Sequence, residues 1–252
     1  KILNDQGSGS FDWFAAAVKA EDNENKAVIA SGWSVVCNGS FGGGTSLVAN
    51  VETALKASTE AGVIYNFAAG NTGQVGVNYP GKSIYSLTVA SLDDNLKRSS
   101  YSTQGPELAI AMPGRNILST YKGGTFATLS GTSMATPFAT ALTAIAKSKW
   151  GAAIPNQAAM RRYMCWIAAD LDAPGRDDLT GWGIAYVRAV LNKNPKDIPP
   201  IFNDRPGGEK PGDPGNPAPP VRETRTIPLV ITGNFPLYWS ADGSLSDADG
   251  AK

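Results

Sequence analysis

The segment GTSMATP, residues 131–137, places a serine between a glycine turn and a run of small, helix-forming residues. Glycine permits a tight turn, and the N–H groups in the first turn of a helix have no partners within that helix. Ser133 would therefore face donors that can stabilise negative charge. Ser133 is a candidate nucleophile, although Gly-Thr-Ser by itself is also a common turn or helix cap.

Two further segments contain groups that such a serine would need. In NFAAGNTG a strand of small residues ends at Gly70 and Asn71, and the Asn71 side-chain amide can donate to an oxyanion. Asparagine at such a junction is also ordinary turn chemistry. In VVCNGSFGGG a strand runs into Ser40, Phe41 and Gly42, and the glycines leave backbone edges free to pair with a peptide.

The base that would activate the serine is missing, because the sequence contains no histidine. A serine hydroxyl is a weak nucleophile until an adjacent base takes its proton. Lys147 cannot replace the base, since 14 residues along one helix from Ser133 correspond to about 21 Å. The serine needs a base from elsewhere, or it has a role other than catalysis.

Composition narrows the possible partners. The 252 residues include 22 basic and 22 acidic side chains, so no long-range field attracts nucleic acid or anionic lipid. No apolar run approaches 18 residues, which predicts no membrane span.

Cys37 and Cys165 lie far apart in apolar segments, which favours two buried thiols over a disulfide framework and leaves the redox compartment open. FGGGTS lacks the ending of a phosphate loop and DADG lacks the first ligand of a calcium loop, so we predict no metal and no cofactor.

The order of apolar runs predicts an α/β protein. Strand-like runs alternate with helix-like stretches as far as about residue 193, which indicates crossover connections and a parallel sheet. Residues 195–220 hold 9 of the 17 prolines, and because proline lacks a backbone N–H we expect neither helix nor strand there, except where the segment lies along the surface of the domain. We therefore divide the chain into a main domain (1–193), expected to be the C-terminal part of a catalytic domain, a Pro/Gly-rich linker (194–223) and the truncated start of a β segment (224–252).

Together and in this order, these segments resemble the subtilisin-like serine proteases, or subtilases. The resemblance covers roughly residues 1–192 and rests on KIL...GSGS, VVCNGSFGG, AAGN, NYPGKSIYSLTVAS, RSSYSTQGPELAIAMPGRNILST, LSGTSMATP and TGWGIAYVRAV. It implies a three-layer α/β fold with a mostly parallel sheet. It also implies that Ser133 begins a central, largely buried helix and that the Tyr79–Pro80 bond is cis.

The resemblance assigns a role to each candidate residue. Ser133 would be the nucleophile, and Asn71 would share the oxyanion hole with the Ser133 N–H. A specificity pocket for a peptide substrate would lie between two segments, with Asn78 near its base. One side would be Ser40, Phe41 and Gly42, and the other Ala68, Ala69 and Gly70. Subtilases are mostly secreted or exported, so an extracellular location follows from the resemblance alone.

The departures from the family concern the other members of the triad. In subtilases the triad residues follow the order Asp, His, Ser, and the first two motifs precede the strand that is Lys1-Ile2-Leu3 here. We therefore expect a sheet that is incomplete on its N-terminal side and a partner segment, upstream of Lys1, that carries the Asp and His. We expect residues 1–252 alone to be inactive. Phe138 replaces a histidine that is usual in the family but lies outside the triad, which we interpret as a packing difference.

Two alternatives to a serine endopeptidase with an acyl-enzyme on Ser133 remain at this point. A pseudoprotease that kept the fold as a binding or structural module would also lack histidine, although Asn71 and the unaltered GTSMATP weigh against it. A sedolisin-type serine-carboxyl protease uses Glu and Asp without histidine, but it has an aspartate where Asn71 stands.

Overall fold

The computed structural model describes residues 2–205, 237–239 and 245–247, which belong to two units, Lys1–Pro214 and Gly215–Lys252. In the second unit, β7 (Leu237–Trp239) pairs antiparallel with β8 (Leu245–Asp247). Both strands lie inside residues 224–252, the segment predicted to begin a β region. The boundaries proposed between the main domain, the linker and this segment stay a prediction.

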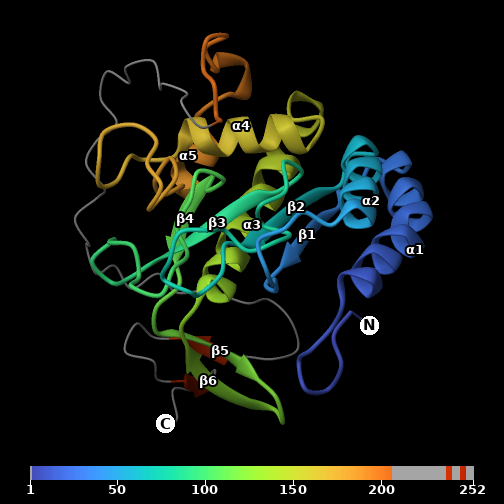
Figure 1. The fold of residues 1–252 in the computed structure, drawn as a ribbon. Coiled ribbons are helices and arrows are strands. Elements are labelled where there is room, and N and C mark those ends of the chain that lie inside the picture. Colours follow the sequence, from blue (N-terminus) through green and yellow to red (C-terminus); the bar gives the residue numbers. More distant parts are fainter. Residues whose placement is uncertain (1, 206–236, 240–244, 248–252) are drawn as a thin grey trace. The chain divides into compact units, whose positions relative to one another are not determined.

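A four-stranded parallel sheet forms the centre of the first unit (Figure 1). Its order follows the sequence: β1 (Val36–Gly39), β2 (Ile64–Ala68), β3 (Leu87–Leu92) and β4 (Ile110–Pro113). The strands β2 and β3 are buried at every position, as expected for parallel strands that are covered on both faces. The predicted α/β class with a parallel sheet is confirmed.

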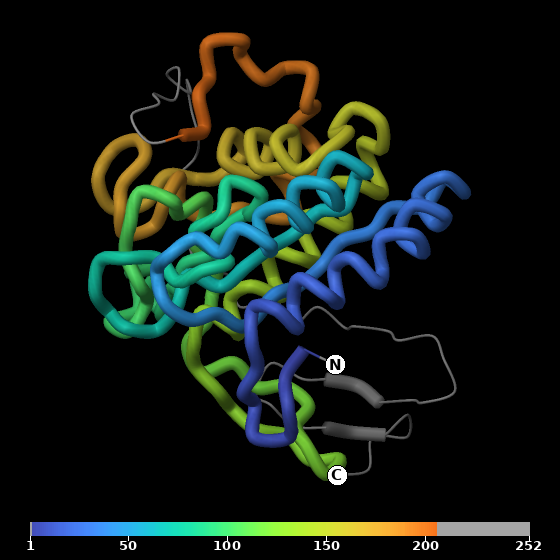
Figure 2. The backbone as a smooth tube through the Cα atoms, turned by 45° about the vertical axis from the view of Figure 1, so that its right-hand side comes forward, coloured from blue at the N-terminus to red at the C-terminus, as the bar shows by residue number. Residues whose placement is uncertain are grey.

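Helices cover both faces of this sheet, which gives the three layers. The helices α1 (Phe11–Ala30) and α2 (Ala49–Glu60) lie side by side against one face (Figure 2). The opposite face carries α3 (Thr132–Trp150) and α4 (Gln157–Ile167), and α5 (Val187–Asn192) packs against α3. Successive side chains of β2 point to opposite faces, so Ile64 enters one core and Tyr65 the other.

A β-hairpin connects the sheet to α3. It consists of β5 (Ile117–Tyr121) and β6 (Thr125–Leu129), which pair antiparallel. The turn between them uses Gly123 and Gly124 at φ of +76° and +70°, a region that favours glycine. Most of the hairpin side chains are exposed.

Short 3₁₀-helices follow α3 and α5, namely η1 (Gly151–Ala153) and η2 (Pro195–Asp197). Among the described residues of the segment 195–220, which was predicted to lack helix and strand except along the domain surface, the one turn of η2 is the only helical part. Residues 198–205 contain neither α-helix nor strand, and the remainder of that predicted segment lies outside the described residues.

Residues 198–205, which we name the C-terminal strap, are fixed to the domain by arginines of α4. The Arg162 guanidinium donates to the carbonyls of Pro199 (2.7 Å) and Phe202 (3.1 Å). The Phe202 side chain is buried, with its ring centroid 5.1 Å from that of Trp182. Although its composition is typical of a linker, this segment is part of the packed domain.

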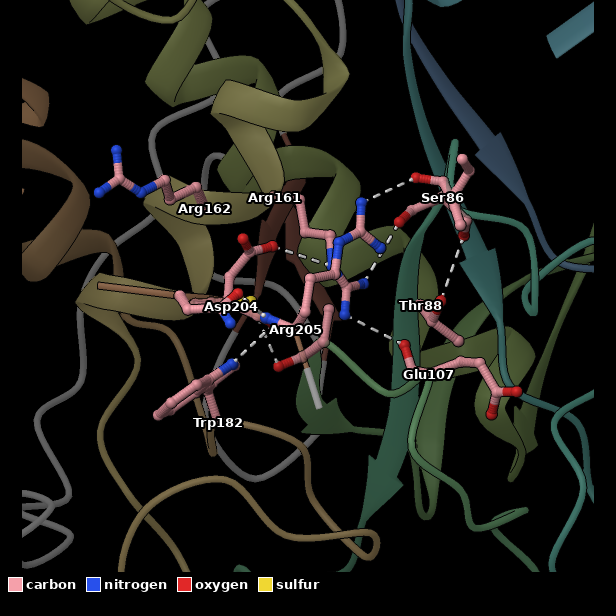
Figure 3. Close-up of polar contacts among 12 residues, drawn as sticks. Ser86, Thr88, Glu107, Arg161, Arg162, Trp182, Asp204 and Arg205 are labelled. Carbon is pink, nitrogen blue, oxygen red and sulfur yellow. Dashed lines mark hydrogen bonds and ion pairs between the residues drawn. The ribbon is translucent and has the colours of Figure 1, made fainter. Parts of the chain in front are cut away.

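A buried ion pair closes the strap (Figure 3). Arg161 has a side chain that is 2% exposed, and its Nε lies 3.1 Å from Oδ2 of Asp204. The two terminal nitrogens of Arg161 donate to the carbonyls of Ser86 and Glu107, both at 3.3 Å. One guanidinium thus joins the strap, the segment before β3 and the segment before β4.

Cys37 and Cys165 form no disulfide, as the sequence predicted. Burial raises the pKa of the Cys37 thiol to about 11. Among the described residues, no helix is both long and apolar enough to cross a lipid bilayer.

Candidate active site

Ser133 lies in the first turn of α3, as predicted. The helix begins after Gly131, whose N–H donates to the Gly114 carbonyl at 2.8 Å, just beyond the end of β4. A Cβ atom on Gly114 would lie 2.6 Å from the Gly131 carbonyl oxygen and 2.4 Å from Ser91 Oγ. Only glycine at position 114 allows the start of α3 to approach the sheet this closely.

Asn71 lies beside this turn and is held through Thr132. The Thr132 N–H donates to Asn71 Oδ1 at 2.8 Å, and the Thr132 hydroxyl donates to the same oxygen at 3.0 Å. The Thr132 hydroxyl in turn accepts from the Gly70 N–H at 3.2 Å. The end of β2 is thereby joined to the start of α3, and the Asn71 oxygen is engaged while its amide donor remains for another partner.

The Ser133 hydroxyl contacts the segment that follows β1. Ser133 Oγ donates to the Ser40 carbonyl at 3.2 Å, and Ser40 Oγ donates to the Ser133 carbonyl at 2.9 Å. The two serines are therefore connected reciprocally. A backbone carbonyl is too weak a base to take the serine proton, so this contact orients the hydroxyl without activating it.

Asn78 lies between the two segments that were predicted to flank a specificity pocket. A Cβ on Gly42 would be 3.4 Å from Asn78 Cβ, and a Cβ on Gly70 would be 2.7 Å from Asn78 Cγ. The Asn78 N–H donates to the Ala69 carbonyl, and the Gly43 N–H donates to the Tyr79 carbonyl, both at 2.9 Å. The Tyr79–Pro80 bond is cis, as predicted.

The remaining predicted residues lie in the same neighbourhood. Ala68 and Ala69 are buried at the end of β2. Ser40, Phe41 and Gly42 line a cavity of about 650 Å³. Its other lining residues include Gly7–Phe11 and Phe14, to which the sequence analysis gave no role; the glycines of GSGS were the available signal.

The prediction that α3 is largely buried holds for only part of its surface. Its buried residues are Thr132, Ala135, Thr136, Ala139, Leu142, Thr143 and Ala146. Pro137, Phe138, Ala141 and Ala144 are exposed, with Phe138 at 42%. Nothing in the described part of the chain covers this apolar face. Among the described strands, β1 likewise pairs only with β2, so its other edge is open.

Lys147 lies far along α3 from Ser133, and its ammonium group donates to the Ile154 carbonyl at 2.9 Å. Burial lowers the pKa of Lys147, but its contact points away from the serine. Within the described residues, no three His, Cys, Asp or Glu side chains gather in a way that could hold a metal ion.

Comparison with known proteins decides the family. The model of the subtilase family matches residues 1–183. The chain belongs to the subtilase family. It is 40% identical over 186 residues to the thermostable alkaline protease of Halalkalibacterium halodurans, which covers 74% of this chain and 48% of that relative. Subtilisin Savinase of Lederbergia lenta is 36% identical over 149 residues, covering 59% of this chain and 52% of that subtilase.

Two solved protein structures share the fold. Sphericase superposes with a TM-score of 0.67 at 28% identity, over 74% of this chain and 67% of its own. The S41 psychrophilic protease gives a TM-score of 0.66 at 27% identity, over the same shares of the two chains. This subtilase chain spans about half the length of the curated relatives that it matches.

Proposed function

We propose that this chain supplies the nucleophile and the oxyanion-stabilising groups of a subtilisin-like serine endopeptidase. The Ser133 hydroxyl oxygen would bond to the peptide carbonyl carbon while a base takes its proton. The C–N bond would then break, the base would return the proton to the leaving amine, and water would hydrolyse the ester on Ser133. Family membership and the position of Ser133 at the start of α3 support this proposal.

The orientation of Asn71 is the observation that carries the proposal. Two hydrogen bonds from Thr132 occupy the side-chain oxygen, which makes the amide nitrogen the end available to a ligand. An oxyanion needs donors that are already in place when the charge develops. The Asn71 amide and the Ser133 N–H, in the first turn of α3, would be those donors.

The substrate would be an extended peptide beside Ser40-Phe41-Gly42 and Ala68-Ala69-Gly70, with the side chain before the cleaved bond directed toward Asn78. Glycine at position 70 leaves room for the Asn78 side chain, and glycine at position 42 leaves room for the Tyr79 carbonyl next to it. Because the Asn78 end group is an amide, it would favour a small or hydrogen-bonding residue over a large apolar one.

The base would come from a segment upstream of Lys1 that carries the triad Asp and His. The open edge of β1 and the exposed apolar face of α3 are surfaces that such a segment would cover. Unpaired strand edges and apolar patches of this kind are usually covered in a complete molecule. Residues 1–252 without that segment would not cleave peptides at a useful rate. As in most of the family, the location would be extracellular.

The test is to produce residues 1–252 together with the upstream segment and to assay both peptide cleavage and labelling by a fluorophosphonate. Cleavage and labelling that require both pieces and disappear in Ser133→Ala support the proposal. Ser148→Ala, at an exposed serine further along the same helix, is the matched control and should retain activity. A folded complex without cleavage that depends on Ser133 would instead indicate a pseudoprotease.

A further inference from the structure

Four hydrogen bonds form a continuous path from the middle of α3 to the nucleophile. Thr140 Oγ1 shares its one proton between Asn38 Oδ1 (3.2 Å) and the Thr136 carbonyl (3.0 Å), and Asn38 Nδ2 donates to Ser40 Oγ at 3.0 Å. Ser40 Oγ donates to the Ser133 carbonyl, and Ser133 Oγ donates to the Ser40 carbonyl. We refer to Thr140, Asn38, Ser40 and Ser133 as the Asn38 network.

The donors and acceptors of this network have one consistent direction. The Asn38 oxygen accepts from Thr140, which turns the Asn38 amide nitrogen toward Ser40. Since the Ser40 oxygen accepts that N–H, its own proton is directed at the Ser133 carbonyl. Bonds in such a chain polarise one another, so loss of an outer bond weakens the inner ones.

The network connects two elements that must keep a fixed spacing. Asn38 lies in β1 and Ser40 directly follows that strand, whereas Thr140 and Ser133 belong to α3. Asn38 is exposed and Thr140 is half-buried, so neither side chain is part of the hydrophobic core. The network thus orients side chains at the site without filling an interior volume.

We propose that Asn38 and Thr140 are positioning residues for Ser133. They hold Ser40, which in turn holds the first turn of α3 and keeps the Ser133 hydroxyl on a backbone acceptor until a base engages it. This inference rests on the proposed function, because it concerns the geometry of the same nucleophile. Small displacements of a reacting group are costly, and 1 Å can reduce the rate by about 10²-fold.

The kinetic test uses the protease assembled with its upstream segment. Asn38→Ala removes both Asn38 bonds and should lower kcat about 10-fold with KM unchanged. Thr140→Val removes only the outer bond, so we expect a loss in kcat of about 3-fold, and Thr140→Ser, which keeps the hydroxyl, should restore the rate. The double variant should be no slower than Asn38→Ala, because both changes interrupt the same path.

Thr53→Val is the matched control for the loss of a threonine hydroxyl in a helix. Thr53 is exposed on α2 and donates to the Ala49 carbonyl four residues earlier, as Thr140 also does to the Thr136 carbonyl. Thr53→Val therefore reproduces the change in helix propensity without touching the network, and its kcat should equal that of the unmodified protease.

A second measurement uses residues 1–252 alone. In Asn38→Ala, amide hydrogen exchange should become faster in residues 131–136 and stay unchanged in residues 145–150 of the same helix. Unchanged exchange at the start of α3, or an equal increase along the whole helix, would overturn the inference. So would a normal kcat for Asn38→Ala in an enzyme that Ser133→Ala inactivates. Cleavage that survives Ser133→Ala would refute the proposed function itself.

Discussion

The start of α3 and the C-terminal strap are both places where segments far apart in the sequence meet, but they differ in how completely they are enclosed. At the strap, the Arg161 guanidinium is buried, paired with Asp204 and bonded to two carbonyls. Around the start of α3, one edge of β1 pairs with none of the described strands and Phe138 is 42% exposed. The strap closes with groups of this chain, whereas on the serine side the described residues leave a strand edge and an apolar helix face uncovered.

This difference separates two properties of the molecule. Stability on the strap side depends on contacts that residues 1–205 already contain. Catalysis on the serine side depends, in our proposal, on groups that this chain does not carry. A change at the strap should therefore alter unfolding, and a change at the serine side should alter activity or assembly.

The largest expected effect is on catalysis when the upstream segment is withheld. Residues 1–252 alone should cleave a peptide substrate about 10⁶-fold more slowly than the assembled protease, the loss known for subtilisin when its triad is removed. Initial rates at equal Ser133 concentration measure this ratio. Robust cleavage by residues 1–252 alone would mean that another base acts on Ser133.

Asp204→Ala should have the next largest effect, on stability. It leaves the Arg161 charge buried without its carboxylate, and breaking a buried pair costs about 3–5 kcal/mol. The free energy of unfolding in urea measures the loss. Asp172→Asn is the control, because its partner Lys97 has a side chain that is 67% exposed and asparagine tolerates the φ of +59° at this position, so little change is expected there. Similar losses of unfolding free energy in both variants would contradict the inference that the buried Arg161–Asp204 pair stabilises the strap more than an exposed ion pair would.

Asn71→Asp tests the oxyanion donor. Aspartate keeps the oxygen that accepts from Thr132 but replaces the amide donor with a second acceptor. The corresponding donor of subtilisin contributes about 10²–10³ in kcat, so we expect a loss of that size in the assembled protease with a small change in KM. Steady-state kinetics measure it, and an unchanged kcat would remove Asn71 from the mechanism.

The smallest effect is expected at the exposed face of α3. Phe138→Gln should change the free energy of unfolding of residues 1–252 by no more than about 0.5 kcal/mol, because this side chain is already partly in water. The same substitution should weaken binding of the upstream segment, which titration calorimetry can measure. Leu118→Gln, at an exposed position of the β5–β6 hairpin, is the comparison. Equal effects of both variants on binding would argue against α3 as the contact surface.

The parts of the fold that were predictable are those encoded by local patterns. The buried runs that became β2 and β3 are apolar or small, and this local pattern predicted strands of a parallel sheet. Ser133 could be placed because a glycine turn followed by small residues is a local signal for the start of a buried helix. The resemblance to subtilases added the cis bond before Pro80, which no local pattern indicates.

The parts that were missed depend on contacts between distant residues. The strap has the composition of a linker, and its packing comes from Arg161 and Arg162, which lie about 40 residues earlier. Asn38 lies in the strand that was predicted to run into Ser40, its side chain is exposed, and its partner Thr140 is 102 residues away. The apolar character of α3 predicted burial on nearly every side, but burial also requires a neighbour for each face. The composition of a segment indicates which local structures it can form, but it does not give the tertiary contacts that the segment makes.

The glycine at position 114 sets a limit for anyone who wishes to engineer this scaffold. A single added methyl group there would meet the Gly131 carbonyl oxygen at 2.6 Å and Ala135 Cβ at 3.0 Å, so α3 would have to move away from the sheet. The contacts of Ser133 with Ser40 and of Thr132 with Asn71 would shift with it. A randomised library that spans this loop should therefore return glycine at position 114 from any selection for turnover, while neighbouring Arg115, on the surface, accepts a wide range of side chains.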